Sequence, residues 1–102
     1  MKITRAEHGF VIHDRGRTLP VQFPDVVAVE GTKVNKVTYD ENYLVLTKAD
    51  GEKIAVGELT RGFAEFEQAI CTALKRFPRE WRMSVEKAQT DETVALWATA
   101  ST

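Results

Sequence analysis

The sequence contains little of the material from which catalytic and metal-binding sites are usually built. Of its 102 residues, one is cysteine, two are histidine and two are serine. Cys71 permits no internal disulfide, as expected in a reducing cytosol, and its mid-helix position favours a structural thiol over a nucleophile. His8 and His13 fall on one expected strand at positions that face opposite sides, which disfavours a shared metal ion. We therefore expect no catalytic residues, no metal site and no cofactor.

Long apolar runs and an excess of positive charge are also missing. The polar start after Met1 lacks the apolar segment of a signal peptide, and no stretch reaches the ~18 apolar residues of a membrane-spanning helix. The formal net charge is −1, whereas general nucleic-acid binding usually requires a basic excess. These features predict a cytoplasmic protein with no transmembrane segment and no nucleic-acid partner.

The strongest positive signal is a β-hairpin. Asp50-Gly51 stands between two β-rich runs, and this pair tolerates the positive φ angles of a two-residue type I′ turn. Such a turn sets Val45 opposite Val56 and distributes apolar side chains over both faces of the hairpin. We therefore expect both faces of the hairpin to be covered, either by other segments of the chain or by another subunit.

An amphipathic helix is predicted directly after the hairpin, over residues 63–77. Gly62 can serve as its N-cap, and Pro78 cannot continue it. The helical spacing places one apolar stripe on Phe63, Phe66, Ile70, Ala73, Leu74 and Phe77. This stripe is expected to pack on the hairpin sheet and to be the main stabilising contact.

The flanking regions complete the predicted architecture. Earlier strands are predicted over residues 2–14, 18–23 and 26–33. Pro20 favours an edge position for the second of these strands. After Pro78 the pattern weakens, and we expect an irregular tail that Trp81 and Trp97 anchor.

The predicted fold class is therefore α+β. We expect a curved antiparallel sheet of about five to six strands in a meander, followed by one long C-terminal amphipathic helix and an irregular tail. Residues 1–102 are predicted to form a single domain. Its core is expected at residues 3–78, and the tail at 79–102 is expected to pack on the core or on a second subunit.

This order of elements resembles the pleckstrin-homology-like fold of small uncharacterised bacterial proteins. The resemblance covers about residues 7–97, and its motifs are structural rather than specific to a function. The segments that carry it are YLVLTKADGEKIAVGEL, GFAEFEQAICTALKRFP, FPREW and the late LW. Such folds serve as scaffolds for peptides, lipids or oligomer contacts, so the resemblance by itself selects no ligand.

A polar segment between two expected strands is the first candidate binding site. It contains Lys33, Lys36, Tyr39 and Asp40, and loops carry function more often than cores do. The alternative interpretation is a solvated turn.

The densest basic run is the second candidate binding site. Arg79 and Arg82 flank Trp81, and basic residues interleaved with aromatic ones can bind an acidic partner or a phosphate backbone. The alternative interpretation is a solvated helix end that complements the helix dipole.

The predicted function is a non-enzymatic binding or protein-interaction module. Because one helix cannot cover both faces of the hairpin, we expect the second face to be covered by the Trp-bearing tail or by another subunit. The partner of the module is expected to be another protein or a second copy, as a homodimer. A second hypothesis is an immunity protein that neutralises a bacterial toxin, since small near-neutral α+β domains without active sites often have that role. A third is a small enzyme, which would require a pocket joining His8 or His13 to a buried carboxylate.

Overall fold

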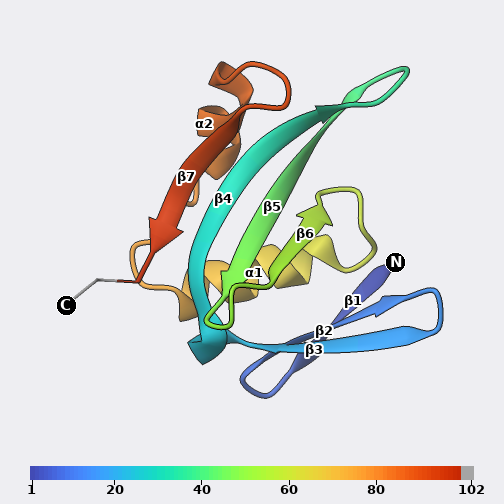
Figure 1. The fold of residues 1–102 in the computed structure, drawn as a ribbon, viewed down its shortest axis with the longest axis vertical. Helices are drawn as coiled ribbons and strands as arrows, with labels where there is room; N and C mark the ends of the chain where they lie inside the picture. The colour runs from blue at the N-terminus through green and yellow to red at the C-terminus, as the bar shows by residue number, and fades with distance from the viewer. Residues whose placement is uncertain (100–102) are drawn as a thin grey trace.

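The protein consists of two antiparallel sheets and two helices (Figure 1), and its structure, a computed structural model, describes residues 1–99. The first sheet has the order β1-β2-β3, with bounds Lys2–Ala6, Gly9–Asp14 and Arg17–Gln22. The second has the order β6-β5-β4-β7, with β4 at Val26–Asn35, β5 at Asp40–Lys48, β6 at Lys53–Gly57 and β7 at Thr93–Ala98. The 3-10 turn η1 is Phe23–Asp25, and the helices are α1 at Phe63–Ala73 and α2 at Trp81–Lys87.

The α+β composition and the antiparallel pairing agree with the sequence prediction, but the predicted fold class is wrong in its architecture. Residues 1–99 form two sheets with seven strands in place of one sheet with five to six. The order is also not a simple meander, because β7, the last strand in the sequence, pairs with β4. A single long C-terminal helix is absent from residues 1–99, which instead contain two short helices.

The helix predicted over residues 63–77 ends early, at Ala73. Leu74 has φ −96° and ψ 109°, which lie outside the helical region. The amide of Phe77 then donates to the carbonyl of Leu74 at 3.1 Å, so the backbone turns here. Both side chains are nevertheless buried. The apolar stripe therefore continues into the core after the helix itself has ended.

The turn between β5 and β6 has three residues rather than the predicted two. The amide of Lys48 donates to the carbonyl of Glu52 at 2.8 Å, and Gly51 has φ 92°, as in a three-residue hairpin with a bulge. This one-residue difference moves the side chains of β6 to the other face relative to those of β5. The apolar residues gather on one buried face as the pairs Leu44–Val56 and Leu46–Ile54. The expectation of two apolar faces is wrong.

One core is shared by both sheets and both helices. The ring of Phe66 on α1 lies 4.6 Å from the ring of Phe10 on β2, and 5.5 Å from that of Phe63. Phe63 in turn lies 6.1 Å from Trp81, the first residue of α2, which is fully buried. Aromatic contacts therefore connect the first sheet through α1 to α2.

Residues 79–99 form α2 and β7 instead of an irregular tail, and both pack on the core. A Cβ atom at Gly31 of β4 would collide with Val85 of α2 and contact Leu96 of β7, so glycine permits this close approach. The part of the predicted tail beyond Thr99 lies outside the described residues. Neither α1 nor α2 has the length and apolar character needed to cross a membrane.

Candidate interaction surfaces

The first candidate surface is the hairpin tip, residues 35–40, where β4 turns into β5. The long hairpin extends beyond the rest of the second sheet, and this turn lies at its far end (Figure 1). The amide of Lys36 donates to the carbonyl of Tyr39 at 2.7 Å and closes the turn. Val37 is fully exposed at 103% and Tyr39 is half exposed at 51%. The tip therefore presents two large apolar groups to solvent.

The charges at the tip are held close to its aromatic residues. The ammonium of Lys36 lies 5.4 Å from the ring centroid of Tyr43, within the range of a cation–π contact. Hydrogen bonding to the Tyr43 side chain raises the pKa of Lys36 above its ordinary value, so this side chain remains a cation. Asp40 opens β5 directly after the turn and is exposed.

The structure separates Lys33 from the other residues predicted for this site. Lys33 lies on β4, and its ammonium donates to the backbone carbonyl of Glu86 on α2 at 3.4 Å. Lys36, Tyr39 and Asp40 do gather at the tip. Lys33 therefore joins the strand to the helix, whereas the other three face the surroundings.

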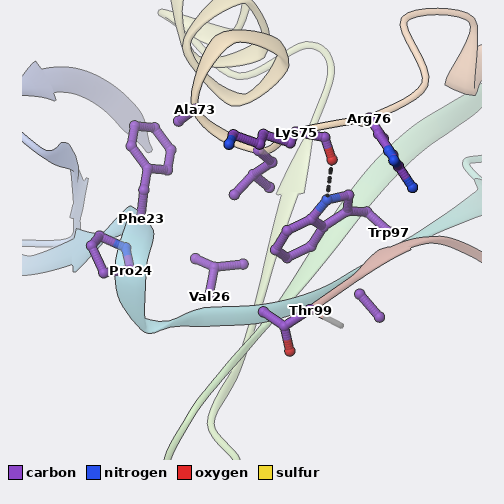
Figure 2. Close-up of a pocket in the computed structure, with 10 residues that line it drawn as sticks. Phe23, Pro24, Val26, Ala73, Lys75, Arg76, Trp97 and Thr99 are labelled. Carbon is purple, nitrogen blue, oxygen red and sulfur yellow. Dashed lines mark hydrogen bonds between the residues drawn. The ribbon is translucent and has the colours of Figure 1, made fainter. Parts of the chain in front are cut away.

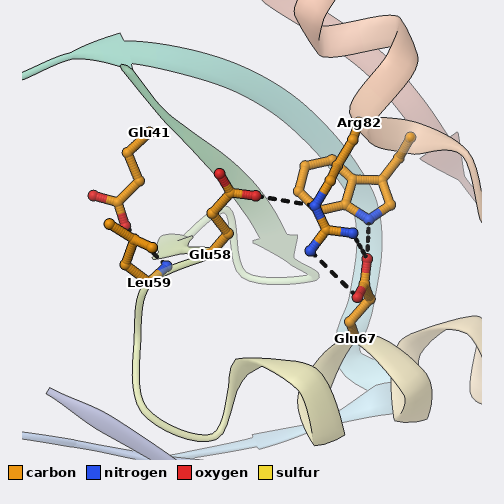
Figure 3. A network of polar contacts seen from close by, with 6 residues as sticks. Glu41, Glu58, Leu59, Glu67 and Arg82 are labelled. Carbon is orange, nitrogen blue, oxygen red and sulfur yellow. Dashed lines mark hydrogen bonds and ion pairs between the residues drawn. The ribbon is translucent and has the colours of Figure 1, made fainter. Parts of the chain in front are cut away.

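The second predicted site is largely internal to the fold. The guanidinium of Arg82 donates to Glu58 at 3.0 Å and to Glu67 at 2.6 Å (Figure 3). The indole Nε1 of Trp81 donates to the same Glu67 oxygen at 2.6 Å. Trp81 is 0% exposed, so it contacts no partner while the protein is folded. This network fastens α2 to α1 and to the chain after β6.

The electrostatics of Arg82 follow from this network. Desolvation lowers the pKa of Arg82, but the hydrogen bonds to Glu58 and Glu67 outweigh it and raise that pKa above its ordinary value. The guanidinium also lies 4.7 Å from the ring centroid of Trp81. Arg82 therefore acts as a charged link between two carboxylates and an aromatic ring.

Arg79 remains exposed, close to the only cysteine in the sequence. It lines a shallow depression together with Cys71 and Arg82. Desolvation raises the pKa of the Cys71 thiol, aided by the charge of Glu67 and opposed by that of Arg79. At neutral pH this thiol is therefore protonated, which supports its interpretation as a structural residue.

A third surface, which the sequence interpretation missed, is the free edge of β7. The strand order leaves β7 at the margin of the second sheet, and its outer side is open in Figure 1. Its sequence, TVALWA, contains neither a charged residue nor a proline. The apolar residues of TVALWA are a signal for a strand. The polar stretch before them led instead to the prediction of an irregular tail.

A hollow of about 760 Å³ lies beside the C-terminal end of β7 (Figure 2). Trp97 forms one wall, and its indole Nε1 donates to the carbonyl of Lys75 at 2.8 Å. Phe23 and Pro24 of η1 lie across from it, and Lys75 and Arg76 bring charge to it. This contact ties the end of β7 to the segment that follows α1.

The third hypothesis, a small enzyme, requires a pocket that joins a histidine to a buried carboxylate. No group of three His, Cys, Asp or Glu side chains in this range is arranged to hold a metal ion. The buried carboxylate there is Glu41, which accepts from the Tyr43 hydroxyl at 3.2 Å and from the Leu59 amide at 3.1 Å. His13 lies on the first sheet and contacts Thr4 at 3.0 Å. Within residues 1–99, the hollows that His13 and His8 line do not include Glu41.

Comparison with known proteins finds no family model, no curated protein and no solved structure that matches this chain. The resemblance to the pleckstrin-homology-like fold therefore stays a prediction. Any functional assignment depends on the surfaces described above.

Proposed function

We propose that this chain is a non-enzymatic protein-interaction module that pairs with a second copy of itself through the free edge of β7. The observation that carries the proposal is the absence of charged residues and proline from the edge strand β7. Edge strands are normally protected by charge, by proline or by a covering segment, because their unpaired backbone groups otherwise pair with another strand. Among the edge strands of residues 1–99, β7 lacks both charge and proline. Its pairing with β4 contains one register shift, between Val29 and Glu30, and a bulge of this kind is the one protective feature that the described residues give this strand.

The other three edges all carry such protection. β1 contains Lys2 and is bridged by Arg61, β3 contains Arg17 and Pro20, and β6 begins with Lys53. Because of this contrast, β7 is the edge at which pairing with a strand from another molecule has the lowest free-energy cost. An uncharged strand also meets no like-charge repulsion when it pairs with its own copy.

The expected assembly is an isologous dimer with two-fold symmetry. Antiparallel pairing of the two β7 strands joins two four-stranded sheets into one continuous sheet. Ala95 and Ala98 are exposed along this strand, and their small side chains permit the ~4.7–4.9 Å spacing of neighbouring strands. The earlier basis for a homodimer, two apolar faces of the β5–β6 hairpin, is replaced by this edge.

The test is the oligomeric state of the wild type and of Ala95→Lys, measured by sedimentation equilibrium over a range of concentrations. Ala95 lies opposite Glu30 on β4, so a lysine there has a carboxylate neighbour within its own subunit and the fold is expected to persist. The matched control is Ala55→Lys, at an exposed alanine on the opposite edge strand β6.

We expect a wild-type dimer, a folded but monomeric Ala95→Lys protein, and a dimeric Ala55→Lys protein. A wild type that stays monomeric at every concentration contradicts the proposal. So does an Ala95→Lys protein that dimerises as strongly as the control.

A second candidate function is the binding of a different protein at the hairpin tip. The exposure of Val37 and Tyr39 favours it, because large apolar groups at a protruding turn are typical of contact residues. The immunity-protein hypothesis uses the same surface, because the tip would then be the part that contacts the toxin.

A photo-crosslinking residue at position 37 tests this second candidate in the native cell. We expect one discrete protein adduct, which Tyr39→Ser weakens, and no such adduct from the same residue at exposed position 72 on α1. Equal adducts from both positions, or an adduct unaffected by Tyr39→Ser, would exclude specific recognition by the tip.

A further inference from the structure

A basin of about 420 Å³ lies at the end of the first sheet where β2 turns into β3. Basic side chains dominate its lining: Lys2, His13, Arg15, Arg17 and Arg61. Asp14 is the one carboxylate residue that lines it. Four permanent cations thus surround one carboxylate in a chain whose formal net charge is −1. The local charge of the basin therefore does not follow from composition.

The fold brings these residues together from three separate segments. The register of the first sheet sets Lys2 of β1 beside His13 of β2, and His13 beside Thr18 of β3. Arg61, from the chain between β6 and α1, forms a parallel bridge with Lys2. The amide of Ile3 donates to the carbonyl of Arg61 at 2.9 Å and fixes this bridge. Backbone pairing therefore fixes the basin on two sides, between the strands of the first sheet and between Lys2 and Arg61.

The four permanent cations of the basin are not ion-paired in the part of the chain that the structure describes. Within residues 1–99, none of Lys2, Arg15, Arg17 and Arg61 forms an ion pair. Arg82, by contrast, is held by two carboxylates. All four side chains of the basin belong to exposed residues, so they are free to contact an anion from solution.

Arg15 occupies a backbone conformation that arginine rarely adopts. Arg15 has φ 50° and Gly16 has φ 78°, which together make a type I′ turn between Asp14 and Arg17. The first central position of this turn favours Asn, Asp or Gly, because other side chains are strained there. An arginine at a strained position that also lines a basic basin points to a functional role.

We propose that this basin binds a phosphate-bearing ligand. Guanidinium groups such as those of Arg17 and Arg61 present paired N–H donors that match phosphate oxygens, and a lysine adds a point charge. The number of free cations suits a diphosphate better than a single carboxylate. A soluble phosphate compound and a phosphorylated lipid headgroup share this chemistry. The proposal does not depend on pairing through β7.

The experiment titrates the full chain with pyrophosphate at low ionic strength and follows backbone amide shifts by NMR. Wild type is compared with an Arg17→Gln/Arg61→Gln variant and with a charge-matched control, Lys75→Gln/Arg79→Gln, whose two residues are exposed and lie outside the basin. We expect saturable shifts around the basin in wild type and control. In the basin variant the affinity should fall at least about tenfold, since two charge-assisted contacts are lost.

Arg15→Asn separates binding from folding. Asparagine suits this turn position better than arginine does, so we expect a melting temperature equal to or above that of wild type together with weaker pyrophosphate binding. Cosedimentation with phosphatidylcholine vesicles containing phosphatidic acid identifies the source of the phosphate. Vesicle binding that pyrophosphate displaces assigns a headgroup, and pyrophosphate binding without vesicle binding assigns a soluble compound. Absence of saturable binding in both assays, or equal binding by the Arg17→Gln/Arg61→Gln variant, overturns the proposal.

Discussion

Two regions of this protein look alike in sequence and differ completely in the folded chain. The hairpin tip and the start of α2 each combine basic residues with an aromatic one. At the tip, Tyr39 is half exposed and its neighbour Val37 is fully exposed. At α2, Trp81 is buried and donates to Glu67, which also binds Arg82. The same composition is thus exposed to solvent in one place and tied into the fold in the other, where Glu67 accepts hydrogen bonds from Trp81 and Arg82.

The largest expected effect is that of Trp81→Ala. This substitution removes a buried aromatic side chain that contacts Phe63 and leaves Glu67 without one donor. We expect a loss of about 3–5 kcal/mol in the free energy of unfolding, measured by urea denaturation. A loss of less than about 1 kcal/mol would mean that α2 is not part of the cooperative core.

A smaller effect is expected when Glu67 loses its charge. Glu67→Gln weakens the ion pair with Arg82, which is 40% exposed at its side chain. Solvent screening therefore limits the expected loss to about 1–2 kcal/mol. The matched control is Glu7→Gln, whose carboxylate is 89% exposed, and whose effect should stay within about 0.5 kcal/mol. Equal effects of the two substitutions in thermal unfolding would remove Glu67 from the stabilising network.

The smallest effect on stability belongs to the tip. Val37→Ser and Tyr39→Ser change exposed side chains, so each should alter the free energy of unfolding by no more than about 0.5 kcal/mol. A loss above about 2 kcal/mol in the same urea titrations would show that the tip packs on the fold. The contrast between an exposed tip and a buried start of α2 would then be wrong.

The sequence predicted the chemistry of these regions better than their placement. Both the tip segment and the residues around Trp81 stood out through their charge and aromatic content. No local pattern indicated that Trp81 faces inward, because the carboxylates that receive it and Arg82 lie at positions 58 and 67, on other segments. The basic basin at the end of the first sheet was hidden for a related reason, since its cations come from residues 2, 15, 17 and 61.

The errors in the predicted fold came from the hairpin turn and from the end of α1. An Asp-Gly pair fits both a two-residue and a three-residue hairpin loop, and only the burial of Leu44, Leu46, Ile54 and Val56 on one face distinguishes them. The apolar stripe predicted for α1 included Leu74 and Phe77. Both residues are buried, although both lie beyond the end of the helix. Apolar periodicity records what is buried, and it does not locate the end of the element that carries it.

The most direct measurement of pairing through β7 is amide hydrogen exchange, followed strand by strand at low and high protein concentration. Amides in the edge strand β7 should gain protection as the concentration rises, while those of the opposite edge strand β6 should exchange at an unchanged rate. Exchange at β7 that is independent of concentration, or protection that appears at β6 instead, would contradict self-association through this edge.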